Sequence, residues 1–526
     1  MTRDDIFIIC CMAQNRYYRV KWTCGRFNQQ KQVAIIYNLI SSDCFYFEGQ
    51  SAMVIDEILQ TPRAGIVKID RILDNFQIPK EELISFLDDL QNFGVLSPVF
   101  PDEQVEAMYR NYIVEMRHNQ NKYSSNPASR ERQIDVSDAE KLYFDTVQTH
   151  GVATSIMFEL TYRCSERCIH CYNPGATRNS KEQCTRGRFQ ELNINDYKRI
   201  IDELCEQGLV KVCLTGGDPF SHPDAWEIID YLYQKEVATD IYTNGQSIYK
   251  QAAKLASYYP RTVGVSIYSD SPKIHDSITS IVGSWEKSMS LIKHLSSLAV
   301  PMYLKCCVMK PNVKTYRGVA EIARKYGAQP QFELNIRESN DGDYCAKNLR
   351  LSEAQLGVVL LDKVIPSNVY LDINEYKERV CDLESSPCKI GIDDFSITPS
   401  GDVQPCAAFP MPLGNLRTHT WKEIVTDNSL LQDWHNCRMK EFDYCGKYDF
   451  CKCCKPCAGL NFIEHGDYRK AAETSCYMAR VRYNLMERLS AGEDVLGGQT
   501  FNQALDNLDE EYSRNLHRQL YNKKTQ

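Results

Sequence analysis

Three cysteines that lie close together in the sequence carry its strongest chemical signal. Cys164, Cys168 and Cys171 follow a short β-type stretch, TSIMFEL, with three and then two residues between them. A 4Fe-4S cubane takes a thiolate on each of its four irons. Three cysteines would therefore leave one iron without a protein ligand, much as an open position marks a catalytic zinc site. A substrate or cofactor could bind at that iron.

A zinc knuckle is the alternative for the same three thiols, and three unrelated thiols in a cysteine-rich chain are another. Zinc would need a fourth ligand, and His170, adjacent to Cys171, is awkwardly placed to complete a tetrahedron. Residues further along the chain favour the cluster.

A second candidate element follows the apolar run VKVCL, which has the pattern of a buried strand. Gly216 and Gly217 would let the backbone approach a ligand closely, and the Asp218 carboxylate beside them accepts hydrogen bonds from an ammonium group. Residues 240–245 and 262–269 are predicted to be further strands, and residues 246–259 have helix-like spacing. Such alternation predicts parallel βα units, whose ligands gather at the carboxyl ends of the strands.

These elements together resemble the radical S-adenosylmethionine (SAM) superfamily. The resemblance implies that the amine and carboxylate of SAM chelate the open iron and that reductive cleavage yields a 5'-deoxyadenosyl radical. GGDP resembles the family's GGEP element, which holds the SAM amino group, and Ser266 matches a strand-end serine near the ribose. His170 replaces an aromatic residue and would cover the adenine. The arginine that many members carry near Thr279 is missing here.

Composition is ordinary for a soluble protein, and we expect a cytoplasmic one. A length of 526 residues predicts several domains, and a net charge of -8 gives no footprint for nucleic acid. No apolar run approaches the roughly 20 residues of a membrane span, and the N-terminus lacks the pattern of a signal peptide. A reducing cytosol keeps thiols free, so the 23 cysteines are not explained by disulfides.

Ten of these cysteines lie between residues 381 and 476, which predicts a metal site. Residues 388–406 have the pattern of a small hairpin, and the spacing resembles the opening of a SPASM domain, which carries auxiliary 4Fe-4S clusters; a zinc ribbon is the alternative. The resemblance implies one auxiliary cluster on Cys381, Cys388, Cys406 and Cys457, and another on Cys445, Cys451, Cys454 and Cys476. Cys453 is an alternative to Cys454, and Cys437 is an alternative to Cys445.

The N-terminal part of the sequence indicates the class of substrate. Residues 33–48 are predicted to form two strands around a Ser-Ser-Asp turn, and helices are expected over 51–60 and 79–93. This order resembles the PqqD-like domain, a small winged-helix fold that binds a leader peptide at a sheet edge. A structural appendage is the alternative. Residues 117–141 are polar, which predicts an exposed or mobile connection.

The expected fold is α/β, with a partial (β/α)6 radical SAM barrel, an N-terminal winged-helix-like α+β domain and a small cysteine-rich SPASM domain. We expect the recognition domain at 1–110, a linker at 111–150, the radical SAM core at 151–375, the SPASM domain at 376–480 and a helical tail at 481–526.

The expected function is that of an oxidoreductase that modifies a ribosomally made peptide through a thioether, a carbon-carbon link or another oxidation. Its partners would be a precursor peptide with a leader and a low-potential donor of the flavodoxin or ferredoxin type, without nucleic acid or membrane. The alternatives are a maturase of a folded protein and a non-catalytic iron-sulfur sensor. The sequence assigns no general base, because Asp402, which resembles a family acid, equally fits a hairpin turn.

Overall fold

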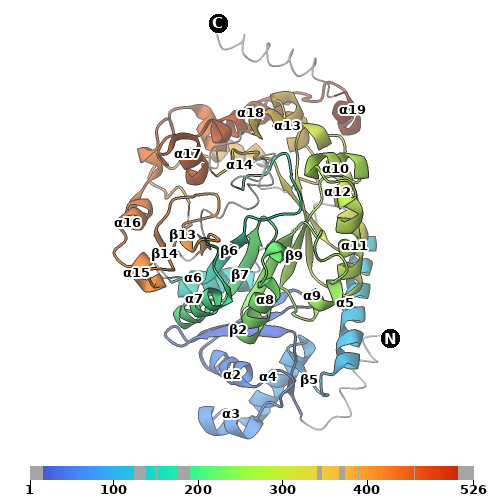
Figure 1. Ribbon diagram of the computed structural model, residues 1–526, viewed down its shortest axis with the longest axis vertical. Helices are drawn as coiled ribbons and strands as arrows, with labels where there is room; N and C mark the ends of the chain where they lie inside the picture. The colour runs from blue at the N-terminus through green and yellow to red at the C-terminus, as the bar shows by residue number, and fades with distance from the viewer. Residues whose placement is uncertain are drawn as a thin grey trace.

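A nine-stranded sheet forms the centre of the computed structural model (Figure 1). The structure describes residues 16–123, 138–148, 152–173, 190–340, 346–365, 373–388, 390–392, 394–454 and 456–507. The strand order is β11-β10-β9-β8-β7-β6-β12-β13-β14, and the six strands from β6 to β11 are parallel. These strands alternate with helices that pack on their outer face, which confirms the expected α/β fold with a partial barrel.

The strands and helices of the barrel are β6 (Ser155–Thr161), α7 (Ile194–Gln207), β7 (Lys211–Gly216), α8 (Ala225–Gln234), β8 (Ala238–Thr243), α9 (Ala252–Ala256), β9 (Thr262–Ser266), α10 (Pro272–Thr279), α11 (Ser284–Ser297), β10 (Met302–Cys307), α12 (Tyr316–Lys325) and β11 (Gln329–Glu333). The helix-like spacing over 246–259 overestimates the helix there, because only the five residues of α9 are helical. Turns around Gly245, whose φ is +81°, occupy the preceding positions.

Local sequence explains where the first barrel helix begins and ends. Asn193 accepts hydrogen bonds from the first turn of α7 and Asp196 bonds back to it, which is a capping box. Gly208 ends the helix at a φ of +107°, a conformation that favours glycine. The apolar face of α7 then packs on β6, where the rings of Tyr197 and Phe158 meet edge to face.

The SPASM region begins by extending the barrel sheet. β12 pairs in parallel with β6 and antiparallel with β13, which confirms the predicted hairpin and joins it to the core. None of the described helices is long and apolar enough to cross a membrane. The elements that follow β11 are α13 (Glu353–Leu360), α14 (Ile373–Glu378), β12 (Asp394–Ile397), β13 (Asp402–Gln404), β14 (Gly414–Asn415), α15 (Trp421–Val425), α16 (Ser429–Asn436), α17 (Ala458–His465), α18 (Glu473–Ser490) and α19 (Phe501–Asp506). Of the expected helical tail, residues 508–526 lie outside the described residues.

The N-terminal unit is a three-stranded antiparallel sheet, ordered β2-β3-β4, packed on three helices. The two strands and both helices expected from the sequence are present. The elements of the unit are β1 (Tyr18–Arg19), β2 (Thr23–Asn28), β3 (Val33–Asn38), β4 (Asp43–Glu48), α2 (Gly49–Gln60), α3 (Ile69–Phe76), α4 (Lys80–Asn92) and β5 (Leu96–Ser97). The unit lies beneath the barrel, whereas the SPASM region lies along one side of the barrel and reaches the opposite end of the molecule with α17 and α18 (Figure 1).

Arginines hold the N-terminal unit and the helix that follows it to the barrel. Arg26 donates to the Leu209 carbonyl at 3.0 Å, which lies just past α7. Arg63 donates to the Tyr233 carbonyl at 2.7 Å in the last turn of α8. Carbonyls at helix C-termini lack partners within the helix and attract cations. The arginines therefore satisfy groups that the barrel helices leave open.

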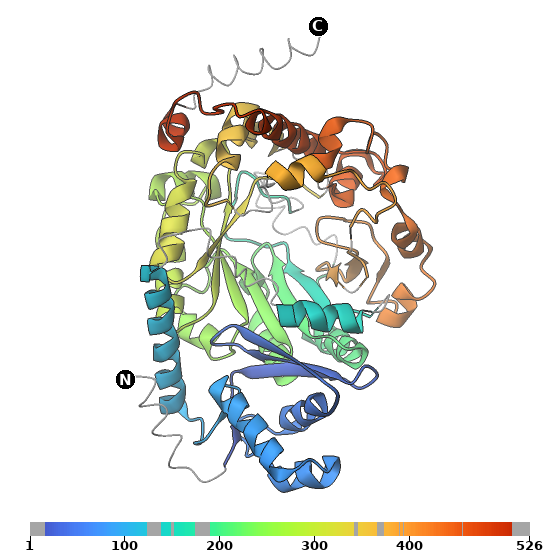
Figure 2. The same ribbon diagram turned by 180° about the vertical axis from the view of Figure 1, so that it is seen from behind.

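Helix α5 (Glu103–Tyr123) spans the start of the expected linker. The helix runs through residue 110, the expected boundary between the recognition domain and the linker, and passes along the side of the barrel (Figure 2). Arg110 donates to the Leu298 carbonyl at 2.6 Å and Arg117 to the Ala299 carbonyl at 2.8 Å. These contacts fix the start of the connection to the barrel. A second helix, α6 (Asp138–Val147), packs on β3 and β4, and residues 124–137 lie outside the described part.

We predict that replacing Glu236 destabilises the protein by about 3 kcal/mol. Glu236 is bonded to Arg19 at 2.5 Å and Arg63 at 3.2 Å, and Arg19 is only 1% exposed. Glu236→Gln would leave Arg19 buried without a counter-charge. Thermal unfolding measures the loss. Glu227→Gln is the matched control, because Glu227 pairs with Lys198 at the surface; equal melting temperatures for both variants would contradict the prediction.

Candidate active site

The three clustered cysteines lie in the loop that leaves the carboxyl end of β6. The Arg167 amide donates to the Thr279 carbonyl and the Ile169 amide to the Ile278 carbonyl, each at 2.9 Å. The loop is thus tied to the last turn of α10. The Thr279 hydroxyl contacts the Ser284 hydroxyl at 2.6 Å. A pair of hydroxyl groups therefore lies near the position at which many family members carry an arginine.

The surroundings of the thiols suit metal ligation. Asn244 Nδ2 donates to Cys164 Sγ at 3.2 Å, and the Glu166 amide donates to the same sulfur at 3.4 Å. Burial raises the pKa of Cys171 to about 11 and also raises the pKa of Cys164 and Cys168 above the ordinary value. Such thiols stay protonated at neutral pH unless a metal stabilises the thiolate.

The two glycines of GGDP allow the end of β7 to touch the cysteine loop. A Cβ on Gly216 would lie 2.3 Å from the Thr161 carbonyl oxygen, and one on Gly217 would lie 2.3 Å from the Arg163 carbonyl oxygen. The Gly217 amide instead donates to Thr161 O at 2.6 Å. Asn173 Nδ2 closes the contact by donating to the Gly216 carbonyl at 2.7 Å.

Asp218 holds this corner together from inside. Its side chain is fully buried and accepts hydrogen bonds from the Thr243 hydroxyl at 2.7 Å and from the backbone amides of Asn244 and Phe220 at 3.0 Å. Both carboxylate oxygens therefore have donors within the protein. In the structure Asp218 fixes the ends of β7 and β8 beside the cysteine loop, and its contact with the SAM amino group stays a prediction.

Several buried polar atoms around the loop lack a hydrogen-bond partner among the described residues, which fits a polar cofactor. They are Glu166 Oε1, His170 Nδ1, Asn173 Oδ1 and Gln246 Oε1. The His170 ring stands edge to face against Tyr268 at 4.8 Å, and burial lowers its pKa to about 4. His170 is therefore a neutral imidazole. Ser266 ends β9 on the same side of the sheet. The residues present thus fit an iron-sulfur cluster with SAM.

The SPASM thiols fall into two groups by their electrostatic neighbours. Cys406 interacts with Cys388 and Cys457. Cys454 interacts with Cys445, Cys451 and Cys476, while Cys381 interacts with Cys451 and Cys445. The resemblance places Cys381 with Cys388, whereas the thiols with which Cys381 interacts in the structure are Cys451 and Cys445. Among the described side chains, no three Cys, His, Asp or Glu residues are placed to hold a single metal ion.

The two alternative ligands, Cys453 and Cys437, pack in apolar clusters. Cys453 is 3% exposed and packs with Tyr376 and Met486, and its interacting charges include no thiol. Cys437 is fully buried in the main core, and its interacting charges also include no thiol. Cys454 and Cys445 are therefore better placed as ligands.

The structure also shows residues that the sequence reasoning missed. Asn244 and Asn173 bond to the cysteine loop and the GGDP corner, and the signal for Asn244 was its place in the turn that ends the strand 240–245. Asp402, by contrast, accepts hydrogen bonds from Ser400 at 2.6 Å and Asn415 at 2.8 Å. These contacts favour the hairpin-turn interpretation of Asp402.

Comparison with known proteins agrees with this geometry. Residues 158–321 match the radical SAM superfamily, and residues 388–458 match the iron-sulfur cluster-binding SPASM domain. The chain therefore contains a radical SAM domain followed by a SPASM domain, and its cofactors are iron-sulfur clusters and SAM.

Among curated relatives, the subtilosin biosynthesis protein AlbA of Bacillus subtilis is 27% identical over 57% of this chain and 66% of AlbA, just under two thirds of its length. The mycofactocin maturase MftC of Mycobacterium ulcerans is 26% identical over 58% of this chain and 83% of MftC. An AdoMet-dependent heme synthase of Methanosarcina barkeri is 25% identical over 60% of this chain and 93% of the synthase. The crystal structure of Streptococcus suis SuiB bound to precursor peptide SuiA aligns over 88% of this chain and 99% of that chain, with 14% identity and a TM-score of 0.47.

Gly217→Ala should abolish SAM binding, because its Cβ would clash with the Arg163 carbonyl and push the GGDP corner off the cysteine loop. Equilibrium dialysis of the iron-loaded protein with SAM measures this. Gly357→Ala is the control, since a Cβ there meets no atom within 4 Å. Unchanged SAM affinity in Gly217→Ala would contradict the assigned role of this corner.

The adjacent cysteines 453 and 454 offer a matched pair. Cys454→Ala should lose about four irons per chain, one cubane, whereas Cys453→Ala should keep the full complement. Iron and sulfide analysis after anaerobic reconstitution measures the cluster content of both variants. Equal losses in both variants would contradict the grouping of the thiols.

Proposed function

We propose that this protein is a maturase that modifies a ribosomally synthesised peptide by hydrogen abstraction with a 5'-deoxyadenosyl radical. The product would carry a thioether, a carbon-carbon link or another oxidation. The observation that carries the proposal is the joining of a radical SAM and SPASM pair to an N-terminal sheet whose edge strand β4 pairs with β3 alone among the described strands. When bound, the clusters and SAM supply the radical, and the residues around GGDP and the cysteine loop orient them.

The names of the relatives restrict the possible classes of substrate only in part. The names of AlbA and MftC refer to the biosynthesis of a bacteriocin and to a maturase, whereas another relative is a heme synthase. All three match 57% to 60% of this chain. The shared part therefore supports the radical chemistry, and the substrate has to be argued from the N-terminal unit.

The edge strand β4 is the feature of that unit that suits a peptide. β4 pairs with β3 on one side, and no other described strand pairs with it. Phe45 on β4 stacks on Phe93 at 4.7 Å, and Phe47 meets Phe86 of α4 at 5.7 Å. An extended peptide could add to this edge through its backbone and place side chains against the aromatic rings. This arrangement supports a PqqD-like role in leader recognition.

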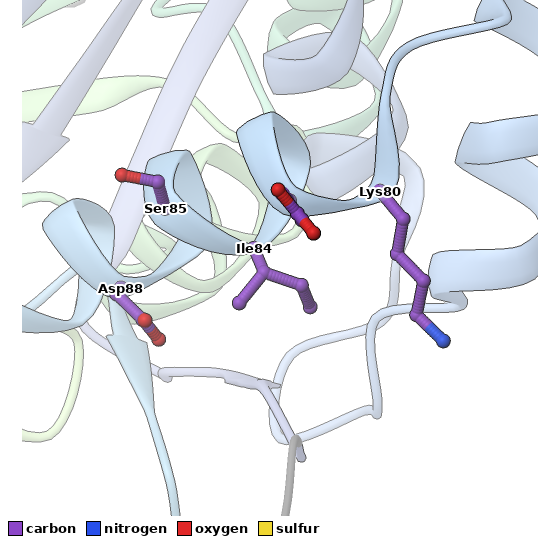
Figure 3. Close-up of a pocket in the computed structure, with 5 residues that line it drawn as sticks. Lys80, Ile84, Ser85 and Asp88 are labelled. Atoms are coloured by element: carbon purple, nitrogen blue, oxygen red, sulfur yellow. The ribbon is translucent and has the colours of Figure 1, made fainter.

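A hollow of about 460 Å³ lies on another face of α4, and Figure 3 shows Lys80, Ile84, Ser85 and Asp88 along it. Asp88 accepts a hydrogen bond from Tyr17 at 2.7 Å. The hollow holds no thiol, and α4 lies at the end of the molecule away from the SPASM region (Figure 1). We assign the hollow no part in the chemistry.

The proposal is tested by reconstituting the protein anaerobically with iron and sulfide and adding SAM, a strong reductant and a candidate peptide encoded beside the gene. We expect about twelve irons per chain, three cubanes' worth, with 5'-deoxyadenosine and a peptide of lower mass by hydrogen loss. Zinc in place of iron, or clusters without SAM cleavage, would contradict the proposal and favour a scaffold or sensor.

Phe93→Ser should weaken binding of that peptide at least tenfold, about 1.4 kcal/mol, because Phe93 is 45% exposed beside β4. Phe100→Ser is the matched control, since Phe100 is 54% exposed but contacts Tyr18 instead. Fluorescence anisotropy with a labelled peptide gives both affinities. Equal peptide affinities for the two variants would contradict a role of the β4 edge in peptide binding.

A further inference from the structure

Most buried carboxylates of the barrel have partners on both oxygens. Asp218 has Phe220, Thr243 and Asn244, and Asp240 has Arg261 and Thr262. Glu140 of helix α6, outside the barrel, shows the same pattern with Tyr37, Lys211 and Arg261. This is the ordinary condition of a buried charge, which has to be hydrogen-bonded or paired. A buried carboxylate that departs from the pattern needs an explanation.

Glu159 on β6 departs from it. The side chain has no exposed area. Its Oε2 accepts a hydrogen bond from the Tyr162 hydroxyl at 3.0 Å, but its Oε1 is buried without a hydrogen-bond partner among the described residues. An unsatisfied buried acceptor is costly, so its persistence suggests a partner that arrives from outside the protein. Glu166 also has an unpartnered oxygen, but that residue lies inside the cysteine loop and belongs to the cofactor site.

Strand alternation directs Glu159 into the barrel. Its neighbours Phe158 and Leu160 belong to the apolar core, and Phe158 packs against Tyr197 on the outer helix α7. Successive side chains of a strand point to opposite faces, so Glu159 points to the inner face. Figure 1 shows β6 beside β7 at the centre of the sheet.

Glu159 interacts electrostatically with the cysteine loop directly and is linked to the SPASM thiols through Arg337. The charge of its carboxylate raises the pKa of Cys171 and Tyr172, at the end of the cysteine loop. The Arg337 guanidinium acts on Glu159 and also on Cys406 of the SPASM region. Arg337 lies 4.1 Å over the ring of Tyr172. A substrate that reaches both the cysteine loop and the SPASM thiols would therefore pass Glu159.

We propose that Glu159 is the proton acceptor of the reaction, with Oε1 receiving the hydrogen bond of an N–H, O–H or S–H group on the reacting residue of the peptide. The bond from hydrogen to nitrogen, oxygen or sulfur breaks, a new O–H bond forms on the carboxylate, and the electron pair stays on the substrate atom. The transfer is a proton transfer alone and needs no oxidant. The inference rests on the proposed function, since it takes the substrate to be a peptide.

The acidity of Glu159 suits this role. Burial raises the pKa of Glu159 to about 7, although the hydrogen bond from Tyr162 and the charge of Arg337 both lower it in part. The carboxylate form, which accepts a proton, gains population as the pH rises through about 7. A base whose pKa lies near the working pH is efficient. The titratable and charged groups that interact with it are Tyr162, Tyr172, Arg337, Cys171 and, from the outer helix α7, Tyr197.

The protonation of Glu159 is tested first on the iron-loaded protein without a peptide. Infrared spectra of the wild type minus those of Glu159→Gln, recorded across pH 5 to 9, should show a protonated carboxyl band that disappears with a midpoint at about 7. The difference removes the contribution of Glu166. A difference spectrum without a titrating carboxyl band would overturn the proposal.

The second readout is the ratio of modified peptide to 5'-deoxyadenosine, measured with the peptide that the wild type modifies. Glu159→Gln should lower this ratio by a hundredfold or more, the usual range for loss of a general base, and Glu159→Asp should restore part of it. Glu140→Gln is the control for a buried carboxylate outside the barrel, on helix α6, and should leave the ratio unchanged. A ratio for Glu159→Gln within twofold of the wild type would overturn the proposal. If the wild type modifies no peptide, the proposed function fails, and the infrared titration still decides whether Glu159 exchanges a proton.

Discussion

The parallel pairing of β6 with both of its neighbours is the constraint on which the rest of the site depends. Phe158 lies opposite Leu214 of β7 on one side and opposite Ile397 of β12 on the other. This register places the cysteine loop beside the GGDP corner and brings the SPASM hairpin to the same strand. A slip by one residue would exchange the faces of the strand and move Glu159 into the apolar core. Strand β6 thus positions the three clustered cysteines, the GGDP glycines, the SPASM hairpin and the Glu159 carboxylate.

Sequence reasoning predicted the parts of the site that are local in the chain. The cysteine triplet, the glycine corner and the hairpin each depend on residues within about twenty positions of one another, so spacing and turn chemistry were enough. The group to which Cys381 belongs stays a prediction, because the thiols with which it interacts, Cys445 and Cys451, lie more than sixty residues away in the sequence and no local spacing links them. The pairing of β12 with β6 is also long-range, and no local pattern marks it.

The N-terminal unit shows a second reason why sequence reasoning stops short. The polar stretch at 117–141 gave the pattern of a loose connection, yet Arg117 at its start bonds to the Ala299 carbonyl. Polarity alone does not distinguish a solvated residue from one whose partner is a helix C-terminus in another part of the fold. The docking residues are arginines, whose planar groups donate several hydrogen bonds while keeping their charge. The unit is therefore held to the barrel by polar contacts as well as by a shared apolar core.

This docking sets a geometric condition on any peptide that the N-terminal unit holds. The unit lies beneath the barrel, whereas the cysteine loop leaves the carboxyl end of β6 (Figure 1). β6 has seven residues and spans about 23 Å at 3.3 Å per residue. A peptide fixed at β4 must cover at least that distance, so about seven extended residues have to separate its bound segment from the residue that reacts. Because the unit is fixed, the spacing between these two parts of the peptide, rather than the swing of a linker, would decide which residue reaches Glu159.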